Sequence, residues 1–370
     1  MPALNILIKP ASGNCNIECK YCFYRALKGD QEHFPKEMSC EIADTILQKA
    51  LDFADGSLSI AFQGGEPTLL GVGYYKRFVE SANRYNKKGV KINYALQTNG
   101  LLLDEEWAKF LKENDFLIGI SLDGIKQSHD KFRTDYSGKP TFAKVLEKIK
   151  LLQEYGVKFN ILTVLNSETV KFPEEIYNFY KNSGYEYIQF LECLEPLGVR
   201  CGTNDYALSN DAYASFLIRF FDLWYEDLKR GRVSSVNIFE NYLAILAKGH
   251  PYDCGMWGFC SAQFIFETDG SVYPCDFYVQ NRWKIGDIKQ DDFRDMKNSS
   301  VANAFEAYSF TVADECAECK YLKLCRGGCR RAKDSPDSQG TNRFCSAYKA
   351  FFDARLDRLI EIVKLYGLKR

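Results

Sequence analysis

Six apolar runs rich in β-branched residues recur between residues 4 and 191 of the 370-residue chain, and they constrain the fold more than any other feature. Helix-length segments separate the runs, and two of these, 39–53 and 142–155, place apolar residues at helical spacing. Strands that alternate with helices build a parallel sheet, and six such units without a Gly-x-Gly-x-x-Gly turn favour a partial barrel over a dinucleotide-binding fold. We therefore expect an α/β protein with strands at Leu4–Lys9, Leu58–Phe62, Lys91–Leu96, Leu117–Leu122, Lys158–Leu165 and Tyr187–Leu191.

Unusual residues follow each of the first four runs. The first leads into a loop that holds three cysteines, and the next three lead into Gln63–Thr68, Gln97–Gly100 and Ser121–Gly124. Because parallel barrels bind their ligands at the carboxyl ends of the strands, we expect these four loops to converge. Taken singly, each is also an ordinary turn, since Gly-Gly, Asn-Gly and Asp-Gly favour turns by backbone conformation alone.

The first cysteine loop contains Cys15, Cys19 and Cys22. A structural zinc site uses four protein ligands, whereas a cubane 4Fe-4S cluster held by three thiolates keeps one iron open for a non-protein ligand. Three thiols at this spacing therefore favour an iron-sulfur cluster that takes part in chemistry. The alternatives are a zinc knuckle with a distant fourth ligand and three unrelated buried thiols.

A second group of eight cysteines lies within 92 residues near the C-terminus. Eight thiols make two complete sets of four, and a set of four fits either a 4Fe-4S cluster or zinc. For the remaining cysteines, Cys40, Cys193 and Cys201, we expect buried and inert thiols.

Composition narrows the class of protein. Lys and Arg number 48 against 49 Asp and Glu, so a net charge of −1 favours neither nucleic acid nor an acidic membrane as partner. The start, MPALNILIKP, lacks the features of a secretory signal, and no apolar stretch is long enough to span a membrane. We expect a cytoplasmic protein, in which 14 cysteines indicate metal or cluster binding rather than disulfides.

The spacing Cys-x3-Cys-x2-Cys followed by an aromatic resembles the signature of the radical S-adenosylmethionine (SAM) enzymes. The resemblance implies a (β/α)6 partial TIM barrel in which SAM chelates the open iron. It also implies that Gly65 and Glu66 meet the methionine ammonium, that Ser121 and Asp123 hold the ribose, and that Arg133 meets the SAM carboxylate. An exposed arginine that only meets solvent is the alternative for Arg133. The full set of expected SAM contacts is Tyr21, Gly64, Gly65, Glu66, Ser121, Asp123 and Arg133.

The second cysteine group resembles the SPASM domain, a C-terminal extension with two auxiliary 4Fe-4S clusters. The resemblance implies three 4Fe-4S clusters in the whole chain. It assigns the first auxiliary cluster to Cys254, Cys260, Cys275 and Cys329, and the second to Cys316, Cys319, Cys325 and Cys345. We expect 1–235 to form the barrel with a helical extension, 236–345 the SPASM domain, and 346–370 a C-terminal helix that packs back on the body.

Over almost its full length the chain resembles the anaerobic sulfatase-maturating enzymes. The matching segments are Lys9–Ser12, Cys15–Tyr24, Phe62–Thr68, Leu96–Gly100, Tyr273–Val279 and Cys325–Arg331. The resemblance implies oxidation of a Cys or Ser side chain to Cα-formylglycine, with Asp276 as general base; a surface or turn aspartate is the alternative. It implies Tyr24, Gln63 and Gln97 as candidate substrate contacts.

The partners that the resemblance implies are a sulfatase polypeptide with a Cys/Ser-x-Pro/Ala-x-Arg motif and a flavodoxin- or ferredoxin-type electron donor. We expect a monomer. A radical SAM maturase of a ribosomally made peptide would share the barrel and the auxiliary clusters, but many such enzymes carry a recognition domain before the barrel, and here Cys15 comes first. A non-enzymatic zinc or iron-sulfur module would leave Gly-Gly-Glu-Pro at 64–67 unexplained.

Overall fold

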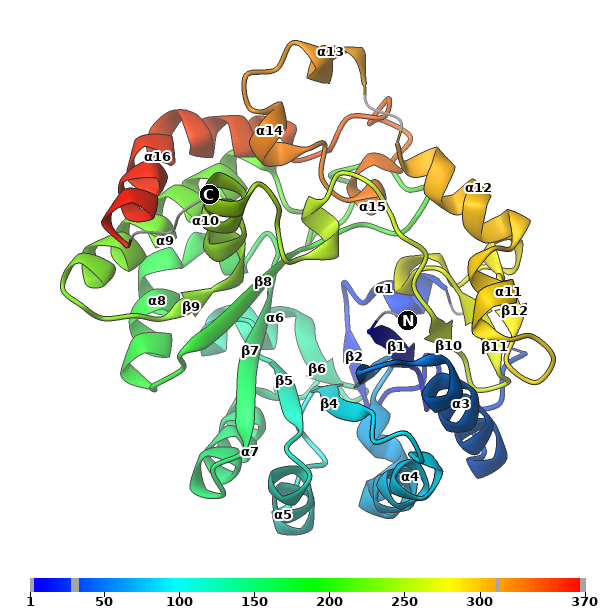
Figure 1. Ribbon diagram of the computed structural model, residues 1–370. Helices are drawn as coiled ribbons and strands as arrows, with labels where there is room; N and C mark the ends of the chain where they lie inside the picture. The colour runs from blue at the N-terminus through cyan, green and yellow to red at the C-terminus, as the bar shows by residue number, and fades with distance from the viewer. Residues whose placement is uncertain (1–2, 28–32, 311–312, 367–370) are drawn as a thin grey trace. The chain divides into compact units, whose positions relative to one another are not determined.

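The computed structural model describes residues 3–27, 33–310 and 313–366 of the chain (Figure 1). The chain divides into two compact units, each made of segments that are far apart in sequence. Unit 1 comprises 1–121, 133–159 and 261–306, and unit 2 comprises 122–132, 160–260 and 307–370. The division expected at residues 235 and 345 stays a prediction. Within the described residues, no helix is long and apolar enough to cross a membrane.

A mostly parallel sheet forms the centre of unit 1. Its strands lie in the order β12-β11-β10-β1-β3-β4-β5, with β11 and β12 antiparallel to their neighbours. Their bounds are β1 Leu4–Ile8, β3 Ser57–Phe62, β4 Lys91–Thr98, β5 Leu117–Ser121, β10 Ile265–Phe266, β11 Ser271–Tyr273 and β12 Gly286–Asp287. The first four expected strands are thus confirmed to within two residues.

Two further strand contacts in unit 1 position its loops. β10 runs parallel to β1 with Ile265 opposite Leu7, so a late segment of the chain lies beside the first strand. A separate two-stranded sheet pairs β2 (Ile17–Cys19) with β6 (Arg133–Asp135) and sets Cys19 opposite Arg133. These pairings bring residues near 15–24, 133 and 267–276 to neighbouring places within the unit.

Amphipathic helices cover the parallel strands of unit 1, and α4 and α5 lie outside the strands that they connect (Figure 1). The side chains of Ser39 and Asp104 cap α3 and α5 by accepting hydrogen bonds from the backbone N–H groups of Ile42 and Trp107. The helices of this unit include α1 Phe23–Ala26, α3 Cys40–Phe53, η1 Pro67–Leu70, α4 Gly71–Tyr85, α5 Glu105–Glu113, α7 Phe142–Glu154, η4 Asp276–Tyr278, η5 Asn281–Trp283 and α11 Phe293–Lys297. The two helices expected from spacing are confirmed as α3 and α7.

Unit 2 contains a second set of parallel strands, β7-β8-β9, and the helices around them. The strands are β7 Lys158–Leu165, whose first two residues belong to unit 1, β8 Tyr187–Glu192 and β9 Ser235–Val236. The helices are α6 Lys126–Phe132, η2 Thr169–Lys171, α8 Pro173–Asn182, α9 Asn210–Lys229, α10 Asn237–Lys248, η3 Cys254–Met256, α13 Asp314–Ala317, α14 Leu322–Cys325, α15 Arg330–Lys333 and α16 Cys345–Leu365; α12, Ser300–Ser309, spans the boundary between the units.

Aromatic side chains form the core between α9, α10 and α16. The ring of Phe221 packs edge-on against Phe351 at 5.6 Å, and Phe239 stacks on Phe351 at 5.9 Å. These aromatic side chains are therefore core, and residues 210–248 form two helices, α9 and α10. The chain leaves α9 at Lys229 because Gly231 takes a left-handed φ of 78°, which a glycine adopts without strain.

Candidate active site

Arg133 lies against the first cysteine loop. Its guanidinium contacts the Cys19 sulfur at 3.5 Å and lies 5.4 Å from the centre of the Tyr21 ring. The side chain is buried, so the alternative of an exposed, solvated arginine is wrong. A buried guanidinium beside the loop supplies positive charge where thiolates, or a ligand carboxylate, would carry negative charge.

The thiols of the cysteine loop are largely shielded from solvent. Burial raises the pKa of Cys15 to about 11, and burial also raises the pKa of Cys22, which the charge of Arg133 opposes. Such thiols keep their protons at neutral pH unless a metal displaces them. Three soft donors on one loop fit an iron-sulfur cluster.

Glu66 joins the loops that follow β3 and β4. Its Oε1 accepts hydrogen bonds from the backbone N–H and the hydroxyl of Thr68, at 3.0 and 2.6 Å, and from the hydroxyl of Thr98 at 2.7 Å. Its Oε2 accepts from the backbone N–H of Asn99 at 2.7 Å. Burial raises the pKa of Glu66, and these bonds oppose the rise. A carboxylate offers about four lone-pair positions, so Oε2 retains room for one more donor.

The two glycines before Glu66 allow the loops to touch. A Cβ on Gly65 would lie 1.9 Å from the carbonyl oxygen of Asn14, and Gly64 takes a φ of 116° that other residues rarely adopt. The backbone N–H groups of Gly65 and Glu66 donate to the carbonyls of Ser12 and Asn14, each at 2.7 Å. The expected convergence of the first two loops is therefore confirmed.

The third and fourth loops also make direct contacts in unit 1. The amide of Asn99 donates to the Cys15 sulfur at 3.7 Å, and the amide of Gln97 donates to the Ser121 hydroxyl at 3.1 Å. Asp123 lies in unit 2, where its Oδ1 accepts from the backbone N–H of Val164 at 2.9 Å. The roles of Gln97, Ser121 and Asp123 toward a ligand stay predictions.

Asp276 begins η4, directly after Cys275. Its Oδ2 accepts hydrogen bonds from the hydroxyl of Tyr24 and from the amide of Gln63, the latter at 3.2 Å, and Gln63 also donates to the Tyr24 hydroxyl at 3.2 Å. Its Oδ1 is buried and accepts no hydrogen bond from the described residues. Burial raises the pKa of Asp276, which the charge of Lys9 opposes. Asp276 is therefore not an exposed aspartate of a surface turn, which was the alternative for this residue.

Lys9 and Glu267 form a buried ion pair behind Asp276 that the sequence did not reveal. Both side chains are inaccessible to solvent, and the ammonium of Lys9 lies 3.9 Å from Oδ1 of Asp276 and 4.8 Å from the centre of the Tyr24 ring. The parallel pairing of β1 with β10 brings these two residues together although they are 258 positions apart. The local signal for this ion pair is weak, because it consists of a charged residue, Lys9, that directly follows an apolar strand.

The second cysteine group is assembled mainly in unit 2. Burial raises the pKa of Cys329 to about 12, with contributions from the nearby Cys260 and Cys254. Burial likewise raises the pKa of Cys325 to about 11, with contributions from Cys345, Cys316 and Cys319. The fourth member expected for the first set, Cys275, belongs to unit 1.

The described residues contain no three His, Cys, Asp or Glu side chains that converge on a single metal ion. Of the other cysteines, Cys193 is buried as expected, whereas Cys40 and Cys201 are half-buried.

Comparison with known protein families gives two matches. Residues 10–180 match the Radical SAM superfamily, and residues 254–320 match the family described as iron-sulfur cluster-binding domain, SPASM. These matches indicate iron-sulfur clusters and SAM as cofactors and agree with the expected (β/α)6 radical SAM barrel followed by a SPASM domain.

Relatives match over the whole chain. The chain is 42% identical to the cysteine-type anaerobic sulfatase-maturating enzyme of Clostridium novyi (strain NT), with 100% of both chains covered. It is 30% identical to the serine-type enzyme of Bacteroides thetaiotaomicron, over 94% of this chain and 88% of that one. The solved structure of native anSMEcpe with bound AdoMet and Cp18Cys peptide has a TM-score of 0.94 and 40% identity, covering 99% of this chain and 100% of that chain.

Proposed function

The chain belongs to the anaerobic sulfatase-maturating enzymes, a family of radical SAM proteins with a SPASM domain, and we propose that it oxidises a Cys or Ser side chain of a sulfatase polypeptide to Cα-formylglycine. The observation that carries the proposal is the carboxylate of Asp276. One of its oxygens is held by Tyr24 and Gln63, and the other is buried and accepts no hydrogen bond from the described residues. A general base needs such an acceptor within reach of the proton that it takes.

The first site would hold the cofactors. When bound, a 4Fe-4S cluster and SAM supply a 5′-deoxyadenosyl radical, which takes a hydrogen atom from Cβ of the substrate side chain. We assign the cluster to Cys15, Cys19 and Cys22. For SAM we propose that Glu66 accepts from its ammonium through Oε2 and that Arg133 meets its carboxylate. Tyr21, Gly64, Gly65, Ser121 and Asp123 complete the proposed contacts.

Asp276 would take the remaining proton. Its Oδ1 accepts the proton of the substrate thiol or hydroxyl as the C=S or C=O bond forms, while Tyr24 and Gln63 hold Oδ2 in place. Gln97 is a further candidate contact with the peptide. One electron must also leave the substrate, and the thioaldehyde formed from Cys hydrolyses to the same aldehyde.

We propose that the eight SPASM cysteines hold the group that accepts this electron. Two auxiliary 4Fe-4S clusters on these cysteines bring the expected number of clusters in the chain to three. A flavodoxin- or ferredoxin-type protein would exchange electrons with the enzyme. Oxygen-sensitive clusters and free thiols suit the reducing cytoplasm, and we propose that the protein is a monomer there.

The substrate sequence that we propose is Cys/Ser-x-Pro/Ala-x-Arg. The greater identity to the cysteine-type relative, 42% against 30% for the serine-type one, favours the Cys form. The hypothesis that the chain is a maturase of ribosomally made peptides is less favoured. The peptide-bound SuiB structure is similar with a TM-score of 0.65 at 18% identity, which is a likeness of fold alone.

Anaerobic incubation of the reconstituted protein with SAM, dithionite and a Cys-x-Pro-x-Arg peptide tests the proposal. Mass spectrometry should show the loss expected when CH2–SH becomes CHO, and the Ser peptide should lose two hydrogens. Formation of 5′-deoxyadenosine without any change of either peptide would refute the proposed substrate.

A further inference from the structure

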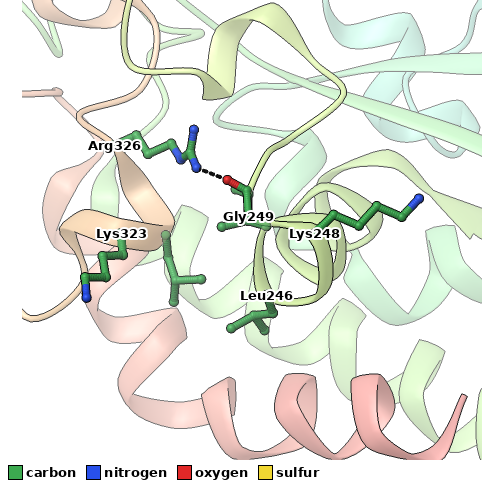
Figure 2. Close-up of a pocket in the computed structure, with 7 residues that line it drawn as sticks. Leu246, Lys248, Gly249, Lys323 and Arg326 are labelled. Carbon is green, nitrogen blue, oxygen red and sulfur yellow. Dashed lines mark hydrogen bonds between the residues drawn. The ribbon is translucent and has the colours of Figure 1, made fainter. Parts of the chain in front are cut away.

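Lys9, which directly follows β1, differs from the other lysines of the chain in its burial. Of the lysines among the described residues, only Lys9 and Lys333 are buried, and the side chain of Lys9 is wholly inaccessible to solvent. Figure 2 shows the common arrangement at a cavity of unit 2, where the exposed side chains of Lys248 and Lys323 extend away from one another. Removing an ammonium group from water is costly, so a buried lysine needs compensating partners.

Two carboxylates and one aromatic ring surround the ammonium group of Lys9. It donates a hydrogen bond to Oε1 of Glu267, lies 3.9 Å from Oδ1 of Asp276, and lies 4.8 Å from the centre of the Tyr24 ring. Oδ1 of Asp276 and Oε2 of Glu267 are both buried, and neither accepts a hydrogen bond from the described residues. Lys9 therefore lies against both the carboxylate that we propose as the base and the tyrosine that holds its other oxygen.

The backbone of unit 1 places Lys9 with little freedom. Its N–H group donates to the Phe266 carbonyl at 2.9 Å, which sets Lys9 beside Glu267, and its carbonyl accepts from the N–H group of Ser12 at 3.1 Å. Gly64 makes room for the aliphatic stem, because a Cβ at Gly64 would lie 3.3 Å from Cβ and 3.4 Å from Cγ of Lys9. The side chain is thus fixed at the backbone and, through Glu267, at the ammonium group.

Stability alone is a poor explanation for this ion pair. Two buried charges lose their hydration, and replacing a buried ion pair by apolar residues of similar volume is often neutral or stabilising. The pair also leaves Oε2 of Glu267 without a hydrogen bond from the described residues. What the pair provides is a positive charge at a defined position beside Asp276.

The carboxylate of Asp276 needs such a fixed charge. The torsion that turns a carboxylate is broad and roughly twofold, so the group can tilt or exchange its oxygens unless both are held. Tyr24 and Gln63 hold Oδ2, and the ammonium group of Lys9 faces Oδ1. At 3.9 Å the ammonium attracts Oδ1 without closing a hydrogen bond, so Oδ1 keeps its lone pairs for the proton of the substrate.

We propose that Lys9, fixed by Glu267, is a positioning residue that sets the orientation of the Asp276 carboxylate for proton transfer from the substrate. Its ammonium group also holds the Tyr24 ring through a cation–π contact, which keeps the Tyr24 hydroxyl on Oδ2. Lys9 acts through these two side chains and takes no proton itself. The inference rests on the proposed function, in which Asp276 is the base.

The test removes both charges at once in a Lys9→Met/Glu267→Met variant, because Lys9→Met alone would leave a buried carboxylate without its partner. Lys76→Met/Glu106→Met makes the same change in an exposed ion pair and is the matched control. We expect wild-type iron content and 5′-deoxyadenosine formation in both variants. In the buried variant, kcat for formylglycine should fall by about 10–100-fold with KM within about twofold of wild type, because a misplacement of about 1 Å can cost about 10²-fold in rate. The control should match wild type in both constants.

A crystal structure of the buried variant adds a measurement that does not depend on activity. We expect the Asp276 carboxylate to leave its wild-type orientation and the Tyr24 ring to shift. An unchanged orientation, or formylglycine synthesis with the wild-type kcat, would overturn the inference. Loss of iron and 5′-deoxyadenosine in parallel with formylglycine would also overturn it, because the ion pair would then support only the fold. Absence of formylglycine from the wild type and the control would instead overturn the proposed function, and with it the role of Asp276 on which the inference rests.

Discussion

Replacing Asp276 by Asn tests the chemistry with little change of structure. Oδ2 of Asp276 accepts from the Tyr24 hydroxyl and from the Gln63 amide, so the Asn side chain should turn its carbonyl oxygen to these two donors. Its NH2 group then takes the place of Oδ1. At that place the wild type presents a buried acceptor, whereas the variant presents a donor that cannot take a proton.

The expected loss follows from the role of that oxygen. A positioned general base contributes about 10²–10⁴-fold to rate. The variant should therefore make formylglycine about 10²–10⁴-fold more slowly, which corresponds to about 3–5 kcal/mol in the activation free energy. Both Tyr24 and Gln63 keep an acceptor, so cluster content and the binding of SAM should not change.

The assay follows both products in the same anaerobic reaction. Chromatography measures 5′-deoxyadenosine, which the Asp276→Asn variant should still form, and mass spectrometry measures the formylglycine peptide, which it should nearly lose. Asp295→Asn, an exposed position on α11, is the matched control and should behave as wild type. Formylglycine synthesis at the wild-type rate in the Asp276→Asn variant would refute the assigned role.

Three further changes test the site and the fold. Glu66→Gln replaces an acceptor by a donor in a buried network, and we expect about 1–3 kcal/mol lower stability in urea unfolding together with weaker SAM binding. Gly65→Ala places a Cβ 1.9 Å from the Asn14 oxygen, and we expect a loss of about 1–3 kcal/mol with lower iron content. In Asp227→Asn a carboxylate is lost whose pKa is lowered: burial acts to raise it, but hydrogen bonds from Lys181 and Tyr177 outweigh burial. Because the pKa of Asp227 is lower in the folded state, its carboxylate stabilises the fold fully at pH values above its unfolded-state pKa, and this stabilisation is lost as the pH falls through its folded-state pKa. The variant should therefore be less stable than wild type by about 1–3 kcal/mol at neutral pH, and this difference should shrink below about pH 4.

Controls accompany these variants. Gly73→Ala on α4 adds a Cβ with no atom within 4 Å, and it should raise stability by about 0.5–1 kcal/mol. Destabilisation of that variant equal to that of Gly65→Ala would contradict the steric argument. A wild-type unfolding curve for Glu66→Gln would contradict the role of its hydrogen bonds, and a deficit of Asp227→Asn that does not vary with pH would contradict the lowered pKa.

Local sequence patterns were enough to predict many of the strands and helices of the fold. Apolar runs and helical spacing determine where strands and helices form, because side-chain alternation and helix periodicity act within a few residues. The same holds for the cysteine loop at 15–22, whose ligands lie close together in sequence. The break between α9 and α10 at 230–236 was not predicted, although Gly231, Ser234 and Ser235 are poor helix formers and give a local signal for it.

The tertiary structure alone decided which side chains surround Asp276. Asp276 meets Tyr24 and Gln63 across separations of 252 and 213 residues, and Lys9 meets Glu267 across 258. The pairing of β10 with β1 creates these contacts, and no local pattern encodes which distant strand a given strand will choose. Gly65 is a second example, because only the folded loops show that its missing side chain makes room for the backbone at Asn14. Sequence therefore determined the types and spacing of the candidate donors, whereas long-range packing decided their partners and which oxygen of Asp276 accepts no hydrogen bond from the described residues.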